Sequence, residues 1–92
     1  VRKDVKETRL TIHNQKGLHA RAAAKFVNIT SKFDSEIKVS RENENVSGKS
    51  IMGLLMLAAV KGTTIRITAN GSDASQVLEE LTRLIDNKFD EE

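Results

Sequence analysis

The chain lacks cysteine and proline, and its only aromatic side chains are three phenylalanines. Without cysteine it can form neither a disulfide nor a thiolate metal site, and two histidines cannot fill a tetrahedral zinc site by themselves. We therefore expect no metal in this chain. The lack of cysteine also fits a reducing, cytoplasmic setting.

Long apolar segments, concentrated positive charge and clustered glycines are missing as well. The longest apolar run, IMGLLMLAAV, has ten residues, about half of what a membrane-spanning helix needs, and the first residues do not follow the pattern of a signal peptide. The net charge is only +2, and few aromatic rings are present on which bases could stack. The five glycines form no phosphate-binding loop, dinucleotide fingerprint or nucleophile elbow. We expect no membrane partner, no nucleic acid and no cofactor.

The chain has the size of one small domain, residues 1–92, with a single modest core. Hydrophobic residues make up 38% and charged residues 30%, which is ordinary for a globular protein. Residues 1–7 have the composition of a loose lead-in. The final DNKFDEE is expected to fray as an acidic end.

Alternating apolar and polar residues predict strands at residues 8–13, 35–40 and 63–69. Asn43 tolerates the left-handed conformation and is expected to form the turn of a hairpin that returns through Val46. The hairpin supplies the remaining strand of a four-stranded sheet.

Helical spacing predicts helices at residues 20–31 and 50–57, and a last helix that begins after a capping Ser72 or Asp73. The order of strands and helices predicts an α+β open-faced sandwich, in which helices cover one face of a four-stranded antiparallel sheet. The apolar positions of the long helices are Ala23, Phe26, Val27, Thr30, Ala74, Val77, Leu78, Leu81, Leu84 and Ile85.

A histidine stands at the start of the first predicted helix, in KGLHARAAAKFV. The first amide groups of a helix lack internal partners and favour an anion, so His19 is expected to be neutral, with a ring nitrogen able to attack phosphorus. The added phosphoryl oxygens would then meet the amides of Ala20 and Arg21 and the guanidinium of Arg21. Lys16 and Lys25 would add a positive rim. A lone histidine near a helix N-terminus is usually an ordinary polar surface residue, and the spacing alone leaves both interpretations open.

The stretch GKSIMGLLML carries more apolar side chains than a short helix can bury. Ser50 is a good N-cap for that helix. Since six large apolar residues follow it, some must be exposed, and we expect Met52 and Leu55 among them. Exposed methionine and leucine suit a surface that meets more than one partner. His13, by contrast, is expected to be a solvated strand residue.

These two stretches together resemble the histidine-containing phosphocarrier family, HPr, of the bacterial phosphoenolpyruvate-dependent phosphotransferase system. Residues 17–23 match its GLHARPA-like signature, and residues 48–59 match its signature around a regulatory serine. The resemblance extends over nearly the whole chain except the two tails. Ala22 replaces the family's usual proline, which leaves the first helical turn less preorganised but sterically intact. This variant is similar to HPr proteins of alphaproteobacteria, in which the relay often serves regulation rather than sugar uptake.

The resemblance implies a stoichiometric carrier rather than an enzyme, with an HPr-like fold. His19 would accept a phosphoryl group on Nδ1 from Enzyme I and pass it to a IIA-type protein, assisted by Arg21. Ser50 would be the target of an HPr kinase/phosphorylase. The protein would be a cytoplasmic monomer, and its partners would dock on Ile51, Met52 and Leu55. The rival hypothesis is a non-catalytic regulatory or interaction domain of similar fold, in which His19 is incidental.

Overall fold

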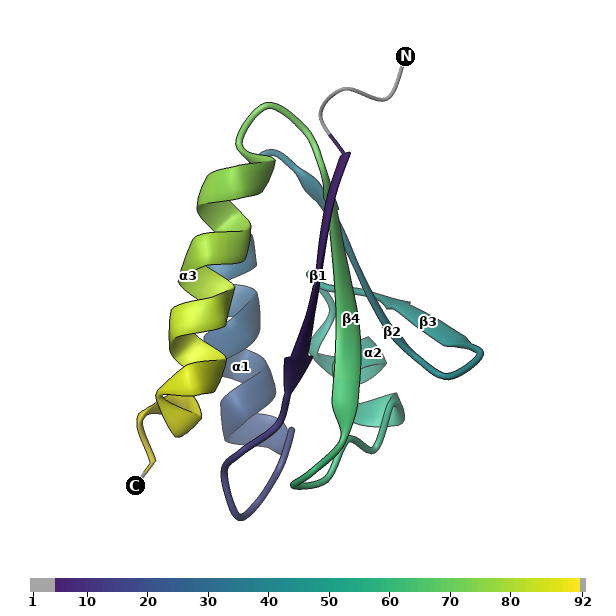
Figure 1. The fold of residues 1–92 in the computed structure, drawn as a ribbon, viewed down its shortest axis with the longest axis vertical. Helices are drawn as coiled ribbons and strands as arrows, with labels where there is room; N and C mark the ends of the chain where they lie inside the picture. The colour runs from purple at the N-terminus through teal and green to yellow at the C-terminus, as the bar shows by residue number, and fades with distance from the viewer. Residues whose placement is uncertain (1–4, 92) are drawn as a thin grey trace.

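The computed structural model describes residues 5–91. One antiparallel sheet has the strand order β1-β4-β2-β3, and the helices lie on one of its faces (Figure 1). This arrangement confirms the predicted open-faced sandwich. No helix within these residues is long and apolar enough to cross a membrane. In chain order the elements are β1 (Val5–Thr11), α1 (Ala20–Thr30), β2 (Glu36–Arg41), β3 (Glu44–Ser47), α2 (Ile51–Met56), β4 (Thr64–Asn70), α3 (Ala74–Asp86) and the short 3-10 helix η1 (Lys88–Asp90).

The core lies between the sheet and the pair α1 and α3, which run side by side (Figure 1). Phe26 on α1 and Ile67 on β4 are fully buried. All six apolar positions predicted for α3, including Leu84, are buried. On α1, Val27 is only partly buried, and Ala22 joins the core instead. Full burial of one such large side chain contributes about 1.5–3 kcal/mol, so this face fixes the helices on the sheet.

Strand β1 begins and ends earlier than the alternation predicted. Residues 5–7, expected to be a loose lead-in, pair with β4 as far as Val5 opposite Asn70, because β4 is long enough to offer them partners. The strand ends at Thr11. Just beyond it, the Ile12 amide donates a hydrogen bond to the carbonyl of Thr63, the residue before β4, at 2.8 Å. The prediction for residues 1–4 lies outside the described residues.

The β2–β3 turn differs from its prediction in one residue. The register places Arg41 opposite Glu44 and leaves two residues in the turn. Glu42, not Asn43, takes the left-handed conformation, with φ 55°. A two-residue hairpin turn matches the right-handed twist of its strands when the first central residue has a positive φ. Glu42 is that first residue, so it adopts the left-handed conformation in place of Asn43.

Asp73 occupies the N-cap position of α3, but its side chain makes no capping hydrogen bond. Its carboxylate instead accepts hydrogen bonds from the amides of Asp34 (2.8 Å) and Ser35 (3.0 Å), and from the Ser35 hydroxyl. The Ser35 hydroxyl is the largest cause that holds the pKa of Asp73 below its ordinary value. Asp73 therefore fastens the start of α3 to the segment before β2.

The C-terminal segment was expected to fray, but residues 86–91 are docked on the fold. Phe89 is fully buried, and Lys25 Nζ donates to the Phe89 carbonyl at 2.7 Å. Lys88, Phe89 and Asp90 all have left-handed φ values of 55°, 56° and 62°. An isolated phenylalanine after a polar helix end was the one sequence signal for this docking, and its burial outweighs the polar character of its neighbours.

Candidate functional site

The turn before α1 is held against the segment that precedes β4. Gly17 has φ +68°, and a Cβ atom on it would lie 2.6 Å from the carbonyl oxygen of Ala59. The Leu18 amide donates to that same carbonyl at 2.8 Å. The Asn14 side chain closes the turn from inside by donating to the Gly17 carbonyl at 2.8 Å. These contacts fix the point at which the next residue, His19, enters the helix.

His19 is the N-cap residue of α1, with an extended backbone at φ −85° and ψ −178°. Its carbonyl accepts the first helical hydrogen bond, from the Ala23 amide at 2.8 Å, but its side chain makes no capping bond. The first-turn amides, including those of Ala20 and Arg21, therefore have no helical partner, and they give this end of α1 a partial positive charge. With 27% of its side chain exposed, the imidazole can be reached from solvent.

A hollow of about 260 Å³ lies beside this turn. Three of its side chains are cationic and two are acidic. Arg21 is exposed, and within residues 5–91 it makes no ion pair, so its guanidinium is available to an incoming anion. Lys25 is committed to the Phe89 carbonyl. The hollow is lined by Gln15, Lys16, Arg21, Lys25, Asp90 and Glu91.

Glu91 and Asn14 complete the surroundings of His19, and neither was predicted from the sequence. Glu91 Oε2 contacts His19 Nε2, while Glu91 Oε1 accepts a hydrogen bond from Asn14 Nδ2 at 2.9 Å. Burial alone would raise the pKa of Glu91, but the hydrogen bonds from Asn14 and His19 and the nearby charge of Lys16 lower it below its ordinary value. The sequence separation of 72 residues between His19 and Glu91 hid this contact.

Ser50 lies where its pattern predicts. It is the N-cap of α2, and its Oγ accepts a hydrogen bond from the Gly53 amide at 3.0 Å. The predicted capping role is thereby confirmed. The side chain is partly exposed, so it can also be reached from solvent.

An apolar patch surrounds α2, and we define it as Ile51, Met52, Met56 and Val60. Their exposed fractions are 40%, 70%, 72% and 62%. Met52 is exposed as expected, whereas Leu55 is only partly exposed, because it packs against the core. Val60 was not expected in the patch. Its backbone lies against Gly17, whose added Cβ would be 2.9 Å from Val60 Cα, and this places the exposed Val60 beside the turn that leads to His19.

His13 is exposed, as expected, although it follows β1 rather than lying within it. No group of three or more His, Asp or Glu side chains within residues 5–91 could hold a metal ion.

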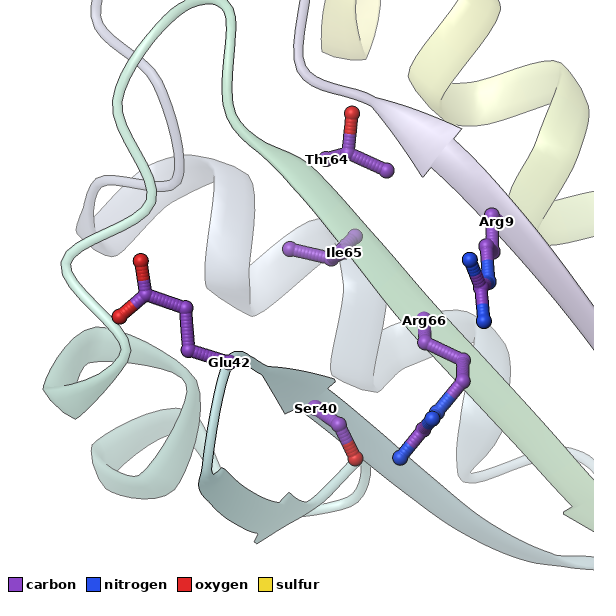
Figure 2. Close-up of a pocket in the computed structure, with 6 residues that line it drawn as sticks. All are labelled: Arg9, Ser40, Glu42, Thr64, Ile65 and Arg66. Atoms are coloured by element: carbon purple, nitrogen blue, oxygen red, sulfur yellow. The ribbon is translucent and has the colours of Figure 1, made fainter.

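A second hollow, of about 240 Å³, lies on the open face of the sheet. It forms where β2 and β4 part, since their pairing ends at Ser40 opposite Arg66. Arg9 and Arg66 are direct cross-strand partners, and Figure 2 shows them on neighbouring strands. Neither guanidinium forms an ion pair within residues 5–91, and Arg66 Nε is buried there without a partner. Two like charges placed opposite each other repel, so this face is electrostatically unfavourable. The hollow is lined by Arg9, Ser40, Glu42, Thr64, Ile65 and Arg66.

Known proteins are similar to this chain in sequence and in fold. Residues 6–87 match the family described as PTS HPr component, phosphorylation site. The phosphocarrier protein HPr of Neisseria meningitidis is 48% identical over 82 residues, which cover 89% of this chain and 92% of that protein. The crystal structure of HPr-C-His from Thermoanaerobacter tengcongensis superposes with a TM-score of 0.91 at 44% identity, covering 95% of this chain and 98% of that one. A crystal structure of an HPr dimer from the same organism superposes with a TM-score of 0.74 at 43% identity, covering 91% and 97%. The chain therefore belongs to the HPr family of phosphocarrier proteins of the phosphotransferase system.

Proposed function

We propose that His19 is the residue through which this phosphocarrier relays the phosphoryl group, that Enzyme I supplies the group and that a IIA-type protein receives it. The observation that carries the proposal is the position of His19 at the start of α1, partly exposed and without a capping bond. Its ring is therefore not committed to the helix, and it stands beside amides and a guanidinium that favour an anion.

The transfer itself forms one bond and breaks another. The lone pair of His19 Nδ1 attacks the phosphorus of a phosphohistidine on Enzyme I, and the electron pair of the breaking N–P bond returns to the donor imidazole. The amides of Ala20 and Arg21 and the Arg21 guanidinium stabilise the phosphoryl oxygens as the group moves. The second transfer, to a histidine of the IIA-type protein, repeats these steps with His19 as the leaving group.

The shallow site suits a carrier. Groups that held the phosphoryl group much more strongly than they hold its transition state would lower its transfer potential and slow its departure. The exposed Arg21 and the first-turn amides are few and open to solvent. A site of this kind accepts the group and releases it.

We further propose that partners dock on the face formed by Ile51, Met52 and the partly exposed Leu55. The other two residues of the apolar patch, Met56 and Val60, extend this face. This face lies next to the His19 turn through Val60. Docking there would bring a partner's histidine toward His19. We infer a monomer in the cytoplasm, the compartment that supplies phosphoenolpyruvate to Enzyme I.

Ser50 is proposed as a regulatory phosphorylation site for an HPr kinase/phosphorylase. A phosphate there would add about two negative charges beside the docking face, while its oxygens could still accept from the first amides of α2. The expected result is weaker docking of acidic partners without unfolding.

Phosphorylation by Enzyme I tests the relay. The protein is incubated with Enzyme I, phosphoenolpyruvate and magnesium, and an acid-labile phosphate is measured. We expect one phosphate per chain in the wild type and in the control His13→Ala, and none in His19→Ala. If the wild type takes up no phosphate, the rival hypothesis of a non-catalytic interaction domain replaces the relay. If His19→Ala still takes up phosphate, the assignment of His19 as the carrier residue is wrong.

The serine proposal needs a different reagent and a different readout. With ATP and an HPr kinase/phosphorylase, the wild type should gain an acid-stable phosphate that is missing in Ser50→Ala, with Ser47→Ala as the matched control. An acid-stable phosphate that persists in Ser50→Ala contradicts the assignment.

A further inference from the structure

We propose that Glu91 is a positioning residue for phosphoryl transfer: its carboxylate binds Nε2–H of His19 and so leaves the lone pair on Nδ1. This inference rests on the proposed role of His19. Phe89 and Glu91 lie outside residues 6–87, the range that the family match covers. The contact is therefore taken from this structure and not from that match.

The direction of the hydrogen bond follows from the chemistry of the two groups. The pKa of Glu91 lies below its ordinary value, so the side chain is an ionised carboxylate near neutral pH. An ionised carboxylate can only accept hydrogen bonds. The contact between Glu91 Oε2 and His19 Nε2 therefore requires the proton to be on Nε2. In a neutral imidazole with Nε2–H, the second nitrogen, Nδ1, carries the lone pair.

Asn14 holds the carboxylate in place. Its side chain is fully buried, and its Nδ2 donates both to the Gly17 carbonyl (2.8 Å) and to Glu91 Oε1 (2.9 Å). Because the first bond ties Asn14 to the turn that leads into His19, the second fixes Glu91 relative to the same turn. Glu91 thus uses one oxygen for the scaffold and one for the imidazole.

The backbone of the C-terminal segment is arranged to bring Glu91 to this position. Three consecutive residues, 88–90, adopt the left-handed conformation that side chains disfavour. The buried Phe89 side chain and the bond from Lys25 Nζ to the Phe89 carbonyl hold them there. A strained segment that is held in one conformation by specific contacts is typical of functional sites.

The carboxylate affects both halves of the transfer. When Nδ1 attacks phosphorus, the imidazole becomes cationic, and the charge of Glu91 on Nε2–H stabilises it. When the phosphoryl group leaves, the electron pair returns to Nδ1, the proton stays on Nε2, and the ring is neutral again. No proton has to be taken up or released in either step. The two ring nitrogens point in different directions, so the carboxylate and the phosphoryl group do not compete for one position.

The test combines the tautomer of His19 with the rate of phosphoryl uptake. Nitrogen-15 chemical shifts of the imidazole report which nitrogen carries the proton. We expect Nε2–H to dominate in the wild type, and its share to fall in Glu91→Ala toward that of an imidazole without a hydrogen-bond partner. We also expect a roughly ten- to hundredfold slower uptake from phosphorylated Enzyme I in Glu91→Ala, the fold-change that corresponds to one charge-assisted hydrogen bond. Glu91→Gln, which keeps an oxygen acceptor without the charge, should lie between the two.

Asp86→Ala is the matched control. Asp86 is an exposed carboxylate at the end of α3, before the left-handed segment, and it does not line the hollow beside the His19 turn. This variant should retain the wild-type tautomer and rate. Wild-type uptake by Glu91→Ala, or an imidazole protonated on Nδ1 in the wild type, overturns the positioning role even if His19 is phosphorylated normally. A wild type that takes up no phosphate overturns the relay instead. The tautomer of His19 is measured without phosphoryl transfer, so it distinguishes the two failures.

Discussion

Replacement of Phe89 by alanine separates the docking of the C-terminal segment from the stability of the fold. Truncation of a fully buried phenylalanine typically costs about 3–5 kcal/mol of unfolding free energy when its surroundings cannot relax. Phe26, on the core face of α1, is in that situation. Phe89 differs, because it lies in a short C-terminal segment that can detach while the sheet and the long helices stay folded.

Detachment also relieves backbone strain. Each of the three left-handed residues at 88–90 costs roughly 1–2 kcal/mol, and the segment recovers this cost when it leaves the surface. The loss in Phe89→Ala is therefore limited to the net free energy of docking. We expect a decrease of about 1–3 kcal/mol, clearly less than for Phe26→Ala.

Urea unfolding gives the free energies, and hydrogen exchange of the amides of residues 88–91 reports detachment. Phe89→Ala should also weaken the Glu91 contact and so shift the His19 tautomer in the same sense as Glu91→Ala. The reasoning is refuted if Phe89→Ala is as destabilising as Phe26→Ala, or if the amides of residues 88–91 stay as protected as in the wild type.

Three further substitutions test other parts of the structure. Gly17→Ala places a Cβ against the Ala59 carbonyl in a left-handed backbone, so urea unfolding should show a loss of more than about 1 kcal/mol. Arg66→Thr removes the like-charge pair with Arg9 and should raise the unfolding free energy by roughly 0.2–1 kcal/mol, less at high salt; a decrease contradicts the described repulsion. The pKa of Asp73 is lower in the folded state than in the unfolded one, so its contacts stabilise the fold above the ordinary value of 3.8 and lose this effect as the pH falls through the folded value. Asp73→Asn should therefore be less stable at neutral pH and lose less stability on acidification, as followed by thermal unfolding from pH 7 to pH 2.

The sequence predicted those features that depend on local periodicity. The buried face of α3, the N-cap role of Ser50 and the entry of His19 into α1 all follow from spacing within a few residues. The extension of β1 to Val5 could not be predicted in this way, because the strand is set by the length of its partner β4. Leu55 was expected to be exposed because the short helix carries too many apolar residues, but the spacing did not show which of them the core would take.

The surroundings of His19 were only half predictable. Arg21 and the first-turn amides are neighbours in sequence, so the helix start alone indicated them. Asn14 gave the signal of an ordinary turn residue, and Glu91 that of a solvated acidic end. Their contact depends on the left-handed backbone of residues 88–90, which residue propensities disfavour. The burial of Phe89 stabilises this conformation, and such tertiary packing cannot be deduced from local sequence.

The central claim, that His19 carries the phosphoryl group on Nδ1, is tested most directly by phosphorus-31 and nitrogen-15 spectroscopy of the protein after phosphorylation by Enzyme I. The account predicts a single acid-labile phosphoryl group per chain, with phosphorus coupled to Nδ1 of His19, and no such signal in His19→Ala. A phosphoryl group coupled to Nε2, or one attached to any residue other than His19, would contradict it.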